Sequence, residues 1–181
     1  MKREFFTHFL FAIPFIIFIT LVKGWLDFRY WQFWLGGVLG TILPYADHFI
    51  YVYVFAPHEL SSQRVASYVS QKRIGSALNL AFATAQERSK LIFHTAYFQL
   101  ILLVLTFWVV TSSGSLLGRG IVLAFSLHLI IDQLEEYLIT KNLNSWFRDF
   151  AFLQPEGLDK EKTCAYFGIN LLALLLFGFL F

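Results

Sequence analysis

The stretch FFTHFLFAIPFIIFITLV, residues 5–22, is eighteen residues long and contains no Lys, Arg, Asp or Glu. At 1.5 Å per residue, a helix of this length measures about 27 Å, close to the roughly 30 Å hydrocarbon core of a bilayer. Comparable apolar runs follow at 33–56, 91–111, 116–139 and 164–181. The sequence therefore predicts an all-α, polytopic transmembrane helix bundle with about five spans.

The composition supports this class of protein. Of the 181 residues, 57% are hydrophobic, 19% aromatic and only 14% charged, a balance that soluble domains rarely reach. Most connections between the apolar runs are too short to fold alone, and we treat residues 1–181 as a single integral membrane domain. The single cysteine, Cys164, excludes an intramolecular disulfide and a cysteine-only metal site. We expect the lipid bilayer as a partner and expect no nucleic acid.

The positive charges are unevenly divided between the two predicted sides of the membrane. The side that holds the N-terminus carries eleven of the fourteen Lys and Arg residues, and the other side carries only Lys23, Arg29 and Arg119. Loops rich in Lys and Arg stay in the cytoplasm. The sequence therefore predicts a protein of the cell (inner) membrane with a cytoplasmic N-terminus and a C-terminus on the far side.

Two longer connections lie on the predicted cytoplasmic side. Residues 57–90 mix apolar side chains with Gln, Ser, Arg and Lys, a pattern that predicts one or two amphipathic helices lying at the lipid headgroups. A solvated loop that obeys the charge rule explains the same cations equally well. Residues 140–163, which include Trp146 and Phe147, are predicted to lie at the interface as well.

Small residues at a spacing of four predict close helix packing. Gly36 and Gly40 form one such pair, and Gly114 and Gly118 form a second. At 100° per residue, the first pair lies on roughly the same side of its helix as Asp47 and His48. Asp47 and His48 should therefore face other helices rather than lipid.

The Asp, Glu and His residues inside the predicted spans all fall in one leaflet, with Glu135 and Glu136 one turn beyond Asp132. In the predicted topology they lie between roughly 5 and 17 Å below the cytoplasmic surface, at 1.5 Å per residue. The far half of the spans holds no Asp, Glu or His. Ionisable groups at membrane depth are costly and generally functional. The residues in question are His8, Asp47, His48, His94, His128 and Asp132.

These side chains have the chemistry of a metal site. His128 and Asp132 are four residues apart, which places an imidazole and a carboxylate on one helix face. Nitrogen and oxygen donors together suit zinc, which we favour, and also manganese or iron(II). Each histidine taken singly is better explained as a hydrogen-bonded packing residue. The whole set at one depth favours a divalent metal.

Four short blocks carry a family resemblance: Thr7-His8, LPYADH at 43–48, SKLIFHT at 89–95 and SLHLIID at 126–132. Their order and local context resemble the YdjM-type family of predicted inner-membrane metal-dependent hydrolases, distantly related to zinc-dependent phospholipase C and the P1-type nucleases. Tyr45 stands where that family has an aspartate, and Ser89-Lys90 where it has His-Arg. These departures argue against a full two- or three-metal centre and leave open a reduced site with one metal, or a protein that has lost catalysis.

The resemblance implies hydrolysis of a phosphoester in a lipid-like substrate, such as a phospholipid or an isoprenyl phosphate, at the cytoplasmic leaflet. It implies metal ligation by His8, Asp47, His94, His128 and Asp132, with His48 as a further ligand or a general base. Catalytic roles are also expected for Glu87 and Lys90, and phosphate binding for Arg73, Arg88 and Lys90. His58 or Glu59 is a further candidate to approach the site from its loop.

Two other classes of function stay open on the sequence. A pair of membrane histidines such as His94 and His128 can ligate a b-type haem, although haem ligation has no need of the neighbouring carboxylates. A proton or metal-ion transporter can use Asp47 and Asp132 as a relay. Confinement of the polar groups to one leaflet argues against a transport path.

Overall fold

The computed structural model describes residues 2–84, 91–147 and 159–180, and every regular element within them is helical. Four helical segments are long and apolar enough to cross a membrane. They are α1 (Lys2–Lys23), the helical run 28–55, α7 (Leu116–Thr140) and α8 (Lys160–Leu180). The all-α prediction and the prediction of a polytopic membrane bundle are confirmed.

The remaining predicted span, 91–111, is shorter than expected because it begins late. The helix α6 (Ala96–Ser112) has 17 residues, a length of about 25 Å at 1.5 Å per residue. Residues 91–95 are not helical, because the Asp47 carboxylate accepts hydrogen bonds from the backbone N–H groups of Ile92 and Phe93. The Thr95 side chain then caps α6 by accepting from the N–H of Phe98.

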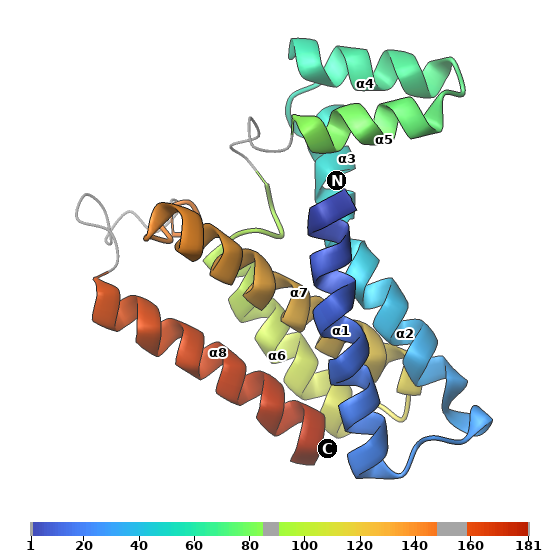
Figure 1. Cartoon of the computed structure of the whole chain (residues 1–181), viewed down its shortest axis with the longest axis vertical. Coiled ribbons are helices and arrows are strands. Elements are labelled where there is room, and N and C mark those ends of the chain that lie inside the picture. The colour runs from blue at the N-terminus through green and yellow to red at the C-terminus, as the bar shows by residue number, and fades with distance from the viewer. Residues whose placement is uncertain (1, 85–90, 148–158, 181) are drawn as a thin grey trace.

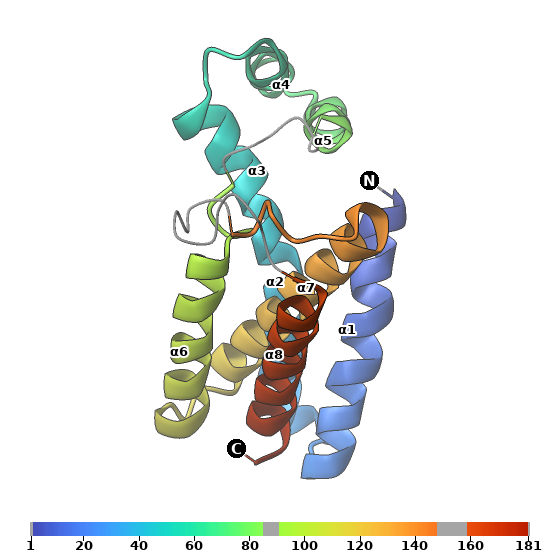
Figure 2. The same cartoon turned by 90° about the vertical axis from the view of Figure 1, so that its left-hand side faces the viewer.

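The long helices run alternately up and down the bundle, so that the N- and C-termini lie at opposite ends (Figure 1). The helix α7 lies in the middle and contacts α1, α2 (Trp31–Ile42), α6 and α8. Figure 2 shows α1 and α6 on opposite sides of α7 and α8. Side chains from the other helices can therefore meet on the surface of α7.

The predicted amphipathic region forms two helices, α4 (Leu60–Ser70) and α5 (Ile74–Ala83). They lie beyond the end of the bundle that holds the N-terminus (Figure 1). Their apolar faces pack on each other, with Val65, Ala77 and Ala81 buried together against Val52. The apolar face of each helix is thus largely covered by its partner, while Arg64 and Arg73 are exposed.

The contact between α2 and α7 depends on glycine. A Cβ atom on Gly36 would lie 2.2 Å from the Leu117 carbonyl oxygen, and one on Gly40 would lie 2.2 Å from that of Ile121. From the other side, a Cβ on Gly120 would lie 2.3 Å from the Phe33 carbonyl oxygen. Close packing at Gly36 and Gly40 is therefore confirmed. In the second predicted pair, a Cβ on Gly118 would lie 3.3 Å from a methyl group of Val109, whereas a Cβ on Gly114 would meet no atom within 4 Å, so the prediction of close packing is wrong for Gly114.

We expect Gly40→Ala to destabilise the protein by about 1–3 kcal/mol, since the added methyl group must push α2 and α7 apart. The matched control is Gly168→Ala in α8, where an added Cβ meets nothing within 4 Å. That control should be neutral or slightly stabilising because alanine favours a helix over glycine. Unfolding midpoints in detergent check the prediction, and equal midpoints for the two variants would contradict it.

Candidate metal centre

The helical run that carries the central polar residues is interrupted at Pro44. Proline has no N–H to continue the α-helical hydrogen bonds, and the chain tightens to a 3₁₀ turn, η2 (Leu43–Tyr45), before α3 (Ala46–Ile50). A π-helical turn, η3 (Tyr51–Phe55), completes the run. Around this irregular section, Thr41, Tyr45 and Asp47 each contact a histidine from another part of the chain.

Asp132 on α7 is the meeting point of three imidazoles. Its Oδ1 atom lies 2.8 Å from Nε2 of His8 on α1. Its Oδ2 atom lies 3.1 Å from Nε2 of His94, which precedes α6, and 3.1 Å from Nε2 of His128, one turn back on α7. Four of the six predicted metal ligands are thus in direct contact, and they come from three separate segments.

The other ring nitrogen of each histidine has a partner of its own. His128 Nδ1 lies 2.8 Å from the carbonyl oxygen of Thr41. His94 Nδ1 lies 3.1 Å from Oδ2 of Asp47, and His8 Nδ1 lies 3.1 Å from the hydroxyl of Tyr45. Carbonyl and carboxylate oxygens only accept hydrogen bonds, so Nδ1 of His94 and of His128 must carry the proton.

This proton placement determines what can lie at the centre. A neutral imidazole protonated on Nδ1 presents a lone pair on Nε2, and at His94 and His128 that lone pair faces a carboxylate oxygen. A proton on an Nε2 atom, a proton on Asp132, or a cation between the Nε2 atoms and Asp132 can satisfy these contacts. A divalent cation also balances the charges of the buried Asp47 and of Asp132, whose side chain is 20% exposed.

The donors fit such an ion in type and in separation. Ligand atoms of His8, His128 and Asp132 all lie within 4.8 Å of one another, and His94, which is outside this group, contacts the same carboxylate through Nε2. Three imidazoles and one carboxylate are a nitrogen and oxygen set suited to zinc. The rings of His8 and His128 are stacked, with centroids 3.8 Å apart and planes at 17°. They must tilt to direct both lone pairs at one ion.

Asp47 occupies a different position from that of the other predicted ligands. Its side chain is 1% exposed, and its oxygens accept from Ile92 N at 3.0 Å, Phe93 N at 2.6 Å and His94 Nδ1. The structure therefore places Asp47 behind His94, where it orients the ring and fixes the start of α6. Carboxylates behind histidine ligands commonly serve metal sites in this way.

Tyr45 belongs to the site although the sequence did not assign it there. Its hydroxyl contacts His8 Nδ1, and its ring meets the His128 ring edge-on, with centroids 4.9 Å apart and planes at 80°. The family resemblance expects an aspartate at position 45, so the sequence suggested that a metal ligand was missing there. The four-residue spacing between Thr41 and Tyr45 was the one available signal that both face the same helices.

The other predicted residues that the structure describes are His48, His58, Glu59 and Arg73. The buried His48 ring lies 6.1 Å from the His94 ring, centre to centre. Glu59 accepts from the hydroxyl of Tyr51 at 2.9 Å, and His58 is exposed. Arg73 lies in the turn after α4, over the ring of Tyr68 at 5.1 Å. Glu87, Arg88 and Lys90 lie outside the described residues.

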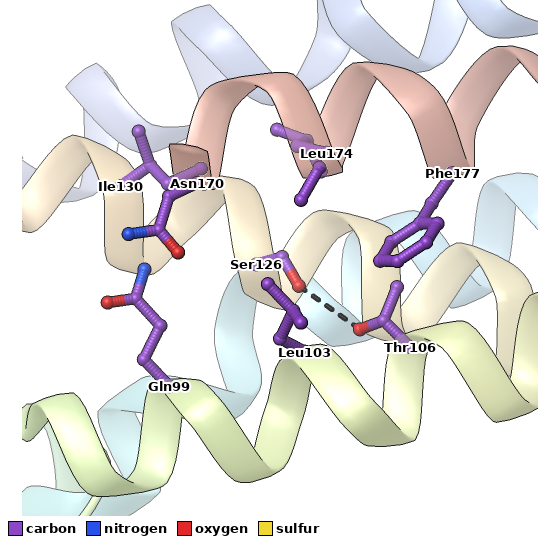
Figure 3. Close-up of a pocket in the computed structure, with 9 residues that line it drawn as sticks. Gln99, Leu103, Thr106, Ser126, Ile130, Asn170, Leu174 and Phe177 are labelled. Atoms are coloured by element: carbon purple, nitrogen blue, oxygen red, sulfur yellow. Dashed lines mark hydrogen bonds between the residues drawn. The ribbon is translucent and has the colours of Figure 1, made fainter. Parts of the chain in front are cut away.

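A small cavity lies on the opposite face of α7 and is separate from the cluster. It has a volume of about 20 Å³, enough for about one water molecule, and is lined by residues of α6, α7 and α8. Figure 3 shows the amides of Gln99 and Asn170 pointing toward one another, with Ser126 and Thr106 farther along the helices and joined by a hydrogen bond. None of the predicted site residues lines this cavity.

Comparison with known proteins leaves the family open. No family model, curated protein or solved structure matches this chain. The metal centre therefore rests on the residues themselves and on their contacts.

We expect Tyr45→Phe to weaken metal binding by about tenfold, because it removes the hydroxyl beside His8 Nδ1 and leaves the ring in place. The matched control is Tyr53→Phe, since Tyr53 is 49% exposed. Zn²⁺ titration of detergent-purified protein provides the measurement. Equal affinities for Tyr45→Phe and the wild type would show that the hydroxyl does not support His8.

Proposed function

We propose that this chain is a membrane-embedded, metal-dependent hydrolase of a phosphoester in a lipid-like substrate. The observation that carries the metal site is the convergence of three Nε2 atoms on Asp132 while each Nδ1 atom has a separate partner. The reaction class is supported by the resemblance of four ordered blocks to the YdjM-type family. Placement at the cytoplasmic leaflet of the inner membrane is supported by the distribution of Lys and Arg.

His8, His94, His128 and Asp132 would hold the ion. A divalent metal bound there supplies a water of lowered pKa and polarises a phosphoryl oxygen. The protein's part is to keep four donors in place within a buried site. Tyr45 and the Thr41 carbonyl orient His8 and His128, and Asp47 orients His94. Orientation by such partners raises metal affinity and fixes the ring tautomers.

The surroundings of the cluster suit an amphiphilic substrate. Phe5 and Phe6, one turn before His8 on α1, are 42% and 66% exposed. The Phe5 ring lies 5.9 Å from the ring of Tyr45, so this apolar surface continues up to the site. A lipid can keep its tail against such a surface while its phosphate reaches the metal. The ligand set and the apolar approach together favour a phospholipid or an isoprenyl phosphate.

Other residues complete the proposal. His48, next to His94, is proposed as the general base or as a further ligand, and Glu87 and Lys90 as additional catalytic groups. Arg73, Arg88 and Lys90 are proposed to bind the substrate phosphate, since cations pair strongly with phosphate oxygens.

The contacts weigh against axial haem ligation by His94 and His128. Both Nε2 atoms lie 3.1 Å from the same oxygen of Asp132. A porphyrin would have to separate them, and the carboxylate occupies that place. We therefore favour the hydrolase over a haem-binding subunit.

An activity assay on detergent-purified protein tests the reaction class. We expect Zn²⁺- or Mn²⁺-dependent hydrolysis of bis-p-nitrophenyl phosphate or of phospholipid in mixed micelles, lost with EDTA and regained with metal. Protein that binds metal but cleaves neither phosphodiesters nor phosphomonoesters would contradict the hydrolase. A Soret band that disappears in His128→Ala would replace it with the haem-binding alternative.

A further inference from the structure

The chain returns to the metal centre after α7 ends. The return segment, residues 141–147, begins at Lys141 in the left-handed conformation, with φ 60°. Leu143 and Trp146 are then 0% and 2% exposed, packed near Phe93 and Phe98. The Trp146 carbonyl oxygen accepts a hydrogen bond from Ala96 N at 2.9 Å. The return segment is thus fastened to the first residue of α6, two residues after His94.

Glu136 fixes the return segment from the other side. It lies one turn beyond Asp132 on the same face of α7. One carboxylate oxygen accepts from Nε1 of Trp146 at 2.9 Å, and the other accepts from the hydroxyl of Ser145. Both oxygens are therefore engaged in holding the return segment, which leaves Glu136 beside the cluster without a role as a ligand.

The Trp146 ring packs against His94. The two ring centres lie 5.8 Å apart, with the planes at 59°. His94 in turn contacts Asp132 through Nε2. A chain of contacts thus leads from Asp132 through His94 and Trp146 to Glu136. Its first and last residues are both on α7. In this chain of contacts the tryptophan restricts the rotation of the imidazole and covers it on the side where α7 ends.

We propose that Trp146 and Glu136 are positioning residues of the metal centre, with Glu136 holding Trp146 and Trp146 holding His94 in the orientation that ligates the ion. This inference rests on the proposed function, because it requires that the cluster bind a divalent metal. Its consequence is that two residues outside the ligand set control affinity and coordination geometry. They do so in series, since Glu136 acts only through Trp146.

The test is Co²⁺ titration of the full-length protein in detergent, with Kd and the visible d–d spectrum as readouts. We expect Trp146→Ala and Glu136→Ala each to raise Kd about tenfold, within the range for residues that support a ligand. Both should alter the d–d spectrum, because His94 is free to turn. The double variant should bind no more weakly than Trp146→Ala, and Trp146→Phe, which keeps a ring but loses the Nε1 hydrogen bond to Glu136, should show a loss similar to that of Glu136→Ala. The control is Trp108→Ala, since Trp108 on α6 is 68% exposed.

The outcomes separate this inference from the proposed function. Wild-type protein that binds no Co²⁺ would overturn the metal site and the positioning role together. Wild-type protein that binds Co²⁺, with Kd and spectrum unchanged in Glu136→Ala and Trp146→Ala, would overturn the positioning role alone. If Trp146→Ala does not fold, Glu136→Ala and Trp146→Phe still decide, because each removes the hydrogen bond between Nε1 of Trp146 and Glu136 and leaves an aromatic side chain at position 146. Additive losses in the double variant would contradict the serial arrangement.

Discussion

Asp132→Asn should reduce metal affinity by more than about 100-fold, beyond the loss expected for any residue that only supports a ligand. Asp132 contacts all three imidazoles, and its negative charge lies directly beside their Nε2 atoms. Asparagine keeps the shape and removes that charge. A cation at the centre would then have no carboxylate ligand. Asp47 lies behind His94 and contacts only the Nδ1 side of that ring.

Asp159→Asn is the matched control for Asp132→Asn. Asp159 is an exposed carboxylate at the start of α8, paired with Lys162 at 3.2 Å. Exposed pairs of this kind contribute little to stability. Isothermal titration with Zn²⁺ measures both variants, and gel filtration reports whether each is folded. Near wild-type affinity in folded Asp132→Asn would show that the ion, if bound, lies elsewhere.

Asp47→Ala should affect both the fold and the metal site. Its carboxylate accepts two backbone N–H groups and one imidazole, and it holds residues 91–95 out of the helix. Removing a charged acceptor and leaving its donors without a partner costs about 2–4 kcal/mol. We therefore expect a clearly lower unfolding midpoint.

Metal affinity in Asp47→Ala should fall about 10- to 100-fold, because His94 loses the partner of its Nδ1 atom. The order of effects is the informative result: Asp47→Ala should lower stability more than Asp132→Asn, and Asp132→Asn should lower affinity more than Asp47→Ala. The reverse order for affinity would make Asp47 a direct ligand, as the family resemblance implies.

The helix bundle could be predicted from the sequence because the length of an apolar run is the main determinant of a membrane-spanning helix. The runs around α1, α7 and α8 needed no tertiary information, and the common depth of His8, His94, His128 and Asp132 followed from alternating passes. The late start of α6 could not be predicted in this way, because Asp47 accepts hydrogen bonds from N–H groups that are 45 and 46 residues away in sequence. Apolar composition alone predicts that the helix continues through residues 91–95.

The residues that support the histidines were harder to predict from the sequence. A backbone acceptor such as the Thr41 carbonyl has no residue-type signal, and Tyr45 was hidden by its difference from the family pattern. Trp146 was assigned to the membrane interface because aromatic residues commonly lie there. Its contact with His94 joins positions 52 residues apart, which neither periodicity nor composition predicts.

The metal content of the protein, purified in detergent without chelators, shows whether the cluster around Asp132 holds an ion. We predict about one divalent ion per chain in the wild type and in Asp159→Asn, because three imidazoles and a carboxylate form a tight site for such an ion. We predict that Asp132→Asn loses that ion. Wild-type protein without metal, or metal retained unchanged in Asp132→Asn, would contradict the metal site.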